Sequence, residues 1–262
     1  MLRMDDVGAA SKRYEVYGLT RIPVAGVRLP FPGNWLWFKY LPPFKRWGPY
    51  RELAAADWRH ILELLASNGA RLTVAVTAAW VERDGTLTPF PQKFPEAAKV
   101  LREGVEAGLL EVANHGLTHC LLADRAFRPR AFASNRQYHR EFYDFVPAEL
   151  QDTHIARSQE ILCDAFRTDV VTFVPPGNLL QPITVEIARR HGLRFLSYRA
   201  PTTLGGVLPV IGDDRGVVFH DRDVILGGVA WLRARLEGSR HREVLLVREL
   251  GERLMQEARG RH

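Results

Sequence analysis

Two histidines in the middle of the chain have the spacing of a metal site. His115 and His119 follow the apolar run 109–113. Neutral imidazole is the commonest protein ligand for zinc and related ions. A four-residue spacing lets both rings point at one ion from a single turn of chain. A strand over 109–113 would also place both rings at its carboxyl end, where α/β folds carry their active sites.

A pair of adjacent carboxylates, Asp5 and Asp6, follows the short apolar run 2–4. Adjacent carboxylates after a strand can supply one metal ligand and one general base side by side. The alternative is a simple turn, because Asp and the following Gly8 are both turn residues. The pattern at this position leaves both interpretations open.

Apolar periodicity and helix-end signals predict the elements that must position these residues. Helices are predicted over 51–68, 94–106, 147–166, 182–191, 224–237 and 244–258, the fifth of them only partly helical. Strands are predicted over 2–4, 71–77, 109–113, 169–174, 193–198, 206–211 and 216–219. We expect irregular structure in the long loops 9–50 and 120–145.

Alternation of strands with helices predicts an α/β fold with about seven parallel strands. The sheet could close into an irregular (β/α) barrel or stay open and doubly wound. We favour the barrel, because only a closed or strongly curved sheet brings together Asp5, His115 and His220, which end strands far apart in the chain. Residues 1–262 are expected to form one catalytic domain.

Composition is that of an ordinary soluble protein of 262 residues, with 46% hydrophobic and 25% charged residues. Apolar runs stay below the roughly 18 residues of a spanning helix. The first six residues include two carboxylates and do not resemble a secretory signal. The two cysteines form no disulfide framework. We therefore expect a cytoplasmic protein.

The formal net charge of +6 favours phosphate-bearing partners such as anionic lipid or a phosphorylated substrate. Cations gather in 39–51, which has no acid, and in 124–140, where five arginines accompany one aspartate. A solvated surface would explain both groups equally well. Nucleic-acid binding is disfavoured, since charge alone supports it and no recognised motif does.

Eight aromatic residues crowd the stretch 31–50, together with four prolines. Long loops of this kind are often lids or binding loops, and aromatic rings among cations also suit an anionic membrane surface. Trp35 and Trp37 are therefore candidates for substrate or membrane contact. Plain packing of the rings on the body is the alternative. Glu141, next to the arginine cluster, is expected at the surface rather than in the site.

Four strand ends together resemble the motifs of the polysaccharide deacetylase superfamily, the NodB-homology group of carbohydrate esterase family four. The first motif is matched by MDDVG at 4–8, and the second by NHGLTH at 114–119. The third is matched by VPPG at 174–177, and the fifth is approximated by VFH at 218–220. These motifs occur in the family's order along nearly the whole chain.

The resemblance implies a distorted (β/α) barrel and a divalent metal, usually zinc, held by Asp6, His115 and His119. Cobalt, nickel or iron could take its place. It also implies Asp5 as the general base and His220 as the general acid. The implied reaction is hydrolysis of an N-acyl group, such as acetyl, from an amino sugar.

Departures from the family pattern bear mainly on the substrate. Val174 stands where the family has an arginine that holds the base aspartate, so Asp5 lacks this partner or borrows another, for which Arg199 is the candidate. A fourth motif is not evident. We expect a lipid-linked, nucleotide-linked or otherwise phosphorylated amino sugar, bound by a set of residues around the third motif and the aromatic loop: Pro176, Gly177, Asn178, Arg199, Trp35 and Trp37.

Two other functions fit the same residues. The site could cut an N-formyl group, another amide or an ester on a non-polysaccharide substrate, because the chemistry at the carbonyl is shared. The fold could also be a carbohydrate- or lipid-binding module whose catalytic machinery has decayed. Retention of both aspartates and of all three histidines favours the enzyme.

Overall fold

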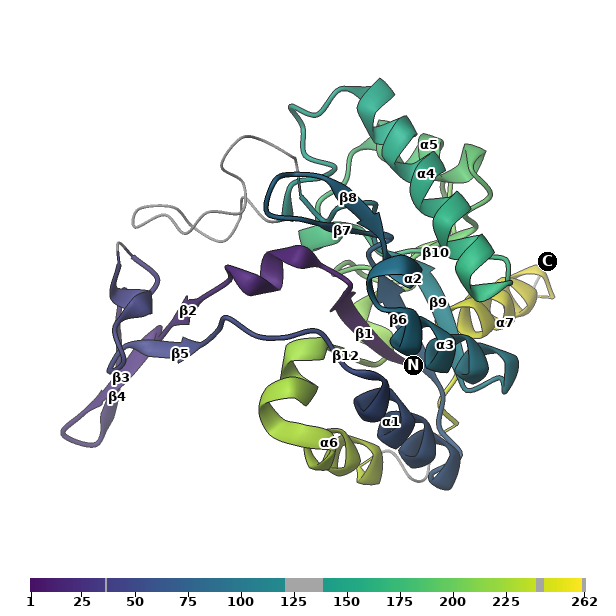
Figure 1. The fold of residues 1–262 in the computed structure, drawn as a ribbon. Helices are drawn as coiled ribbons and strands as arrows, with labels where there is room; N and C mark the ends of the chain where they lie inside the picture. The colour runs from purple at the N-terminus through teal and green to yellow at the C-terminus, as the bar shows by residue number, and fades with distance from the viewer. Residues whose placement is uncertain (36, 121–138, 239–242, 261–262) are drawn as a thin grey trace.

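The fold is built on one curled parallel sheet of six strands in the order β11-β10-β9-β6-β1-β12 (Figure 1). The computed structural model describes residues 1–35, 37–120, 139–238 and 243–260. The strands are β1 (Leu2–Val7), β6 (Leu72–Val76), β9 (Leu110–Asn114), β10 (Thr172–Phe173), β11 (Phe195–Leu196) and β12 (Val217–His220). The α/β class and the parallel sheet predicted from the sequence are confirmed. The predicted strand at 206–211 gives only isolated bridges, one of them parallel between Val210 and Leu196.

Strand β1 lies inside the sheet between β6 and β12, although it comes first in the chain. Every residue of β1 is buried, including three charged ones. Its pairing with β12 aligns Leu2 with Val217 and Asp5 with His220. Parallel pairing therefore places the carboxyl ends of β1 and β12 side by side at the same end of the sheet.

Helices connect the strands and cover the sheet, as short parallel crossovers require. They are α1 (Ala55–Ser67), α2 (Phe90–Lys93), α3 (Pro95–Glu106), α4 (Ala148–Phe166), α5 (Pro182–Arg190), α6 (Asp221–Glu237) and α7 (Val247–Arg259). The six predicted helices are present, and α2 was not predicted. Helix α6 breaks at Gly228, whose φ is +66°. None of the described helices is both long and apolar enough to span a bilayer.

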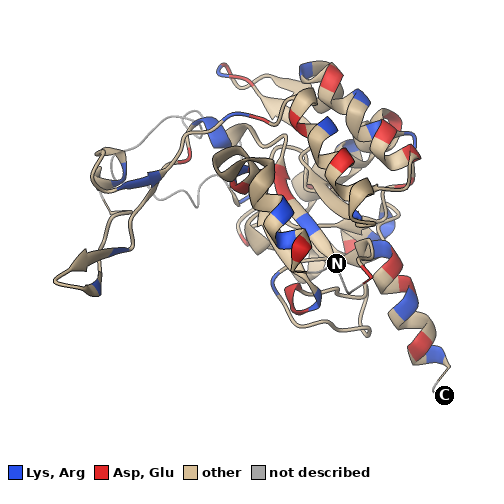
Figure 2. Cartoon of the chain, turned by 90° about the horizontal axis from the view of Figure 1, so that it is seen from below, with Lys and Arg blue, Asp and Glu red and all other residues tan. Residues whose placement is uncertain are grey.

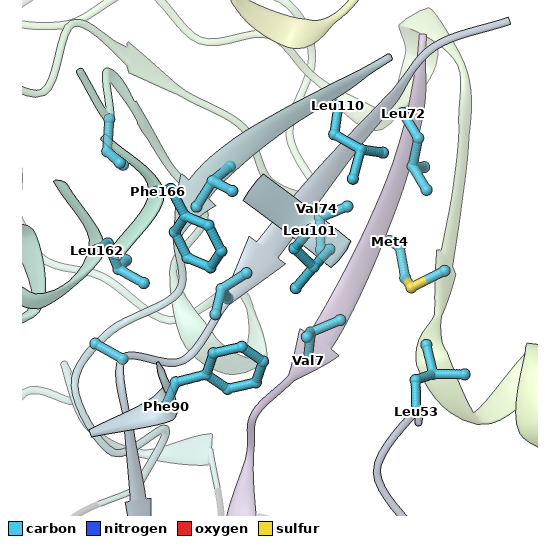
Figure 3. Packing of buried hydrophobic residues seen from close by; sticks show 14 of the residues in the cluster. Met4, Val7, Leu53, Leu72, Val74, Phe90, Leu101, Leu110, Leu162 and Phe166 are labelled. Carbon is cyan, nitrogen blue, oxygen red and sulfur yellow. The ribbon is translucent and has the colours of Figure 1, made fainter. Parts of the chain in front are cut away.

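The core lies between the sheet and its covering helices (Figure 3). Met4 and Val7 of β1 and Val74 of β6 pack near Leu101 of α3 and Phe90 of α2, all of them buried. On α1, Trp58, Ile61 and Leu65 face inward and are fully buried, and Leu62 is half-buried. Burial of these large apolar groups fixes the sheet on which the strand ends are mounted.

An arm projects from the body between η1 (Ala10–Arg13) and α1 (Figure 1). Its base is the antiparallel pair β2 (Tyr17–Gly18) and β5 (Lys45–Trp47), and beyond it lie the hairpin of β3 (Arg21–Val24) and β4 (Val27–Pro30) and the short helix η2 (Phe38–Tyr40). Much of the expected loop 9–50 is thus built of short regular elements. A further hairpin joins β7 (Ala79–Val81) to β8 (Leu87–Pro89). Most of the other expected loop, 121–138 of 120–145, lies outside the described residues.

Glu111 ties three strands and a helix together at the end of the sheet away from the strand ends that carry the motifs. Its buried carboxylate accepts hydrogen bonds from Thr172 Oγ1 at 2.6 Å, Thr73 Oγ1 at 2.8 Å and the Arg248 backbone amide at 3.1 Å. These donors belong to β10, β6 and α7. Burial raises the pKa of this carboxyl group, which the three donors offset only in part.

We expect Glu111→Ala to destabilise the protein by about 2–4 kcal/mol, because it leaves three buried donors without an acceptor. Urea unfolding measures the change. Glu111→Gln keeps an acceptor oxygen and should cost less. Glu106→Ala, on the exposed face of α3, is the matched control and should change the free energy of unfolding by less than about 0.5 kcal/mol. Equal losses in Glu111→Ala and Glu106→Ala would contradict the role given to this carboxylate.

Candidate functional site

The strand ends that carry the motifs open into a cavity of about 870 Å³. A volume of this size suits a small-molecule ligand. Its lining combines acids, cations and aromatic rings: Asp5, Asp6, Glu15, Tyr17, Arg46, Trp47, His115, His139, Arg140, Tyr143, Pro175, Gly177, Asn178, Leu179, His220, Arg222, Asp223 and Leu226. The cavity therefore brings together residues from most of the length of the chain.

Consecutive strand residues normally face opposite sides of a sheet, yet Asp5 and Asp6 both line the cavity. The pairing of β1 with β6 shifts register between Met4 and Val7. Within that irregularity Asp6 has a φ of +72°, in the left-handed region that residues with a side chain seldom adopt. The bulge turns the second carboxylate toward the same mouth as the first. Such local strain is often found at functional sites.

Three side chains converge as a metal site would require. One ligand atom each from Asp6, His115 and His119 lies within 4.8 Å of the others. Asp6 Oδ1 is 3.4 Å from His115 Nε2 and 3.2 Å from His119 Nε2. All three residues are buried. The structure therefore brings together the three ligands predicted from the sequence.

The tautomer of His115 suits a ligand. Its Nδ1 lies 2.6 Å from the backbone oxygen of Val174, which can only accept, so Nδ1 carries the proton. Nε2, which faces Asp6, is then left with a lone pair for a metal. An oxygen and two imidazole nitrogens form a borderline donor set that suits zinc and its neighbours. The side chains present thus fit a divalent transition metal.

Glu141 holds the turn that carries His119. Its buried carboxylate accepts the amides of Leu117, Thr118 and His119 at 2.8, 3.2 and 2.8 Å, and lies 2.7 Å from His154 Nδ1. His119 itself has a φ of +65°. Glu141 is thus buried, and the surface position expected for it is wrong. The four donors compensate the desolvation of its carboxylate.

Gly116, in the same turn, has a φ of +78° and leaves the space that the Glu141 carboxylate fills; a Cβ there would collide with it. The sequence signal that could have found this contact is the glycine of NHG, which leaves room for another group to approach the backbone.

Arg3 is the cation that pairs with Asp5, a role that Val174 cannot fill. Its Nε and Nη2 donate to the two oxygens of Asp5 at 2.9 and 3.1 Å. The guanidinium is buried, and its Nη1 donates to Ser197 Oγ at 2.7 Å and lies 3.1 Å from Asp213 Oδ1. Burial alone would raise the pKa of Asp5, but the charge and hydrogen bonds of Arg3 outweigh it, and the pKa lies below its ordinary value.

Arg199, the expected partner of Asp5, does not take this role. Its side chain is exposed, and its backbone amide donates to Asn178 Oδ1 at 2.8 Å. Arg3 and Asp5 are two residues apart on one strand, so their side chains share a face of the sheet. The period-two spacing of Arg3 and Asp5 was the available signal for this pair.

His220 lies beside both aspartates. It is the register partner of Asp5, and its Nε2 is 3.9 Å from Asp6 Oδ2. Arg222 Nη2 donates to His220 Nδ1 at 3.0 Å and Nη1 donates to Asp6 Oδ2 at 3.3 Å. Burial would raise the pKa of Asp6, but His220, His115 and His119 outweigh it and hold that pKa well below its ordinary value.

The remaining predicted residues divide between cavity and arm. Gly177 and Asn178 line the cavity, whereas Pro176 is buried and is not among the described residues that line it. Trp35 and Trp37 lie on the arm, 64% and 50% exposed, and neither is among the described residues that line the cavity.

Several lining residues were not singled out from the sequence. Tyr17 and Trp47 stack at the base of the arm, with ring centroids 5.0 Å apart and planes at 15°. Arg222 lies over Trp47 at 4.7 Å, and Arg140 over Tyr143 at 5.1 Å. These rings come from short antiparallel strands and a segment after residue 138, whose positions near the cavity no local pattern predicts.

A second cluster of buried charged groups holds the chain that follows Asp5 and Asp6. Lys12 is fully buried and donates to Glu52 Oε2 at 2.6 Å and to Asp221 Oδ2. Glu52 also accepts the amide of Gly8, which follows the Asp pair. The cluster connects η1, the start of α6 and the chain before α1, so it fixes the strand ends that surround the cavity.

Known proteins share sequence and fold features with this chain. The family model described as polysaccharide deacetylase matches residues 48–196. A structure from Mycobacterium smegmatis, described as a putative polysaccharide deacetylase, has 13% identity and a TM-score of 0.54 and aligns over 77% of this chain and 78% of its own.

A CE4 family pseudoenzyme from Bacillus anthracis has 14% identity and a TM-score of 0.45 over 74% of this chain. The chain spans 60% of the length of that protein. A deacetylase domain from Bordetella bronchiseptica has 19% identity and a TM-score of 0.42, over 64% and 68% of the two chains. No curated protein matches the chain.

Replacing Arg3 tests its coupling to Asp5. We expect Arg3→Met to destabilise the protein by about 3–5 kcal/mol, because it leaves a buried carboxylate without its cation. In an Asp5→Asn background the same replacement should cost much less. Urea unfolding of the two single variants and the double variant gives the coupling energy, expected to exceed about 1.5 kcal/mol. Additive losses would show that Arg3 acts independently of Asp5.

Replacing Glu141 tests its hold on the turn of His119. Glu141→Ala should weaken zinc binding by about 10- to 100-fold, the usual effect of removing a group that orients a ligand. Zinc titration with a competing chromophoric chelator measures the affinity. Glu149→Ala, at the start of α4, is the control and should leave the affinity unchanged. Unchanged zinc affinity in Glu141→Ala would contradict the proposed support.

Proposed function

We propose that this chain, which belongs to the polysaccharide deacetylase family, is a metal-dependent hydrolase that removes an acyl group from the nitrogen of an amino sugar. The observation that carries the proposal is the convergence of two aspartates and three histidines at the strand ends, where all of them but His119 line the cavity. Loss of function commonly removes such groups first, yet all five are present. Their convergence favours an enzyme over a decayed binding module of the same fold.

Asp6, His115 and His119 would hold the metal. When bound, a divalent ion of this kind lowers the pKa of a water molecule and polarises a carbonyl group. The carboxylate of Asp6 and two neutral imidazoles leave positions open for water and substrate. The Val174 carbonyl and the Glu141 carboxylate keep the two rings in place.

Asp5 would act as the general base. Arg3 holds both of its oxygens and keeps the carboxylate ionised, so that it can accept a proton from the attacking water. Each oxygen retains a lone pair beside its bond to Arg3, since a carboxylate oxygen can accept more than one hydrogen bond. The burial of Arg3 also prevents the base from turning away from the cavity.

His220 would act as the general acid toward the departing nitrogen. Arg222 Nη2 lies 3.0 Å from Nδ1 and Asp223 Oδ2 lies 3.9 Å from the same nitrogen, so both neighbours hold that side of the ring. Nε2, which lies 3.9 Å from Asp6 Oδ2, is the nitrogen that would give its proton to the departing amine.

Cations and aromatic rings at the mouth favour an amino sugar that carries an anionic group. Arg46 and Arg140 line the cavity, and within the described chain neither has an acidic side chain within 4 Å. The stacked pair of Tyr17 and Trp47 offers an apolar face to a sugar ring. These residues support a lipid-linked, nucleotide-linked or otherwise phosphorylated amino sugar over a neutral polysaccharide.

Metal content and hydrolysis together test the proposal. We expect about one divalent ion per chain in the purified protein, lost in His115→Ala and His119→Ala and kept in His60→Ala, whose histidine is exposed on α1. The metal-loaded protein should release acetate from N-acetyl amino sugars, faster when they carry phosphate. Asp5→Asn should keep the metal and lose at least about 100-fold in rate, the usual contribution of a general base.

Formate release from N-formyl sugars and hydrolysis of simple acetyl esters would distinguish the other acyl substrates within the same assay. A protein that takes up no metal on reconstitution would remove the hydrolase proposal. A protein that binds metal and sugar without hydrolysing any of these substrates would support the binding module.

A further inference from the structure

The hairpin of the arm has one apolar face and one basic face. The turn at Ala25 and Gly26, with φ of +48° and +83°, is a two-residue hairpin turn. The register pairs Ile22 with Leu29 and Val24 with Val27, and in an antiparallel pair such partners share a face. The alternate pairs, Arg21 with Pro30 and Pro23 with Arg28, lie on the other face.

The apolar face of the hairpin is uncovered. Val24, Val27 and Leu29 are 47%, 60% and 45% exposed, and Trp35 nearby in the arm is 64% exposed. Seven of the twelve exposed large hydrophobic residues of the described chain lie on the arm, between residues 17 and 41. Apolar groups concentrated in this way on a projecting element mark an interaction surface.

The charge on the arm has a single sign. Between Glu15 and Glu52 the sequence contains six cations and no acid. Arg21, Arg28 and Lys45 are exposed, and in Figure 2 the blue of Lys and Arg recurs along the arm. Apolar side chains beside exposed cations complement an anionic surface with an apolar interior.

We propose that the arm is a docking surface for an anionic phospholipid bilayer. The apolar face of the hairpin and the Trp35 and Trp37 rings would enter the interfacial layer, while Arg21 and Arg28 would contact lipid phosphates. A second copy of the arm fits less well, because it would bring one basic surface against another. The inference rests on the arm alone and not on the metal or the reaction proposed above.

Such docking would also place the cavity at the membrane. Tyr17 and Trp47, at the base of the arm, line the cavity, so the arm and the mouth are continuous. The stacked rings of Tyr17 and Trp47 and the β2–β5 pairing connect the arm to the mouth of the cavity.

Vesicle sedimentation with the full chain tests the proposal. We expect the protein to pellet with vesicles of phosphatidylcholine and phosphatidylglycerol at a 7:3 ratio, and at least tenfold less with pure phosphatidylcholine. Val27→Glu/Trp35→Glu should weaken binding to the mixed vesicles at least tenfold. Arg21→Gln/Arg28→Gln should weaken it at least threefold and reduce its dependence on salt.

Ile183→Glu/Val207→Glu is the matched control, since it also replaces two exposed apolar residues, 41% and 43% exposed, with two acids. It should bind as the wild type does. Equal binding to both vesicle types, or an equal loss in the control, would overturn the proposal. So would a wild-type dimer in sedimentation equilibrium that Val27→Glu/Trp35→Glu converts to a monomer, because a second copy would then cover the face.

Discussion

The parallel pairing of β1 with β12 is the interaction on which the site depends. It places Asp5 directly beside His220, across 215 residues of sequence, while the pairing of β1 with β6 and of β6 with β9 brings in His115. Parallel strands end at one edge of a sheet, so the order of the strands decides which side chains meet. The bulge at Asp6 then adds a second carboxylate at the same edge without adding a strand.

Buried charges hold the site in place at a cost in desolvation. Arg3, Lys12 and Glu141 are each almost wholly buried, and each contacts at least two partners. A buried ion is tolerated only when its partners compensate the loss of water. Removing one member of such a cluster therefore leaves the remaining buried ions without compensation for their lost hydration. Arg3 orients Asp5, Lys12 and its partners hold the chain after Asp6, and Glu141 holds the turn of His119. The stability of the fold and the geometry of the site therefore rest on the same contacts.

The strand-end residues were predictable from the sequence because local pattern and chain order carry the signal. Apolar runs mark β6, β9 and β12, and the residues that follow them meet once the sheet is parallel. The residues that hold these side chains in place were harder to predict from the sequence. Glu141 reaches the His119 turn from outside the regular elements, and Arg3 lies in the strand itself, where a charged residue reads as an edge or surface position. The sequence predicts a loop where the structure has the arm, because the strands of the arm have two to four residues and are too short for a periodic signal.

The position of the first strand inside the sheet has a consequence for synthesis on the ribosome. Asp6, His115 and His119 have all been made once residue 119 is in place, whereas His220 follows 101 residues later. At roughly 5–20 residues per second that interval is about 5–20 s. Throughout it one side of β1 has no neighbour, because β12 has not yet been made. The nascent chain thus carries Asp6, His115 and His119 before His220, with an open sheet edge that a chaperone or a premature strand could occupy.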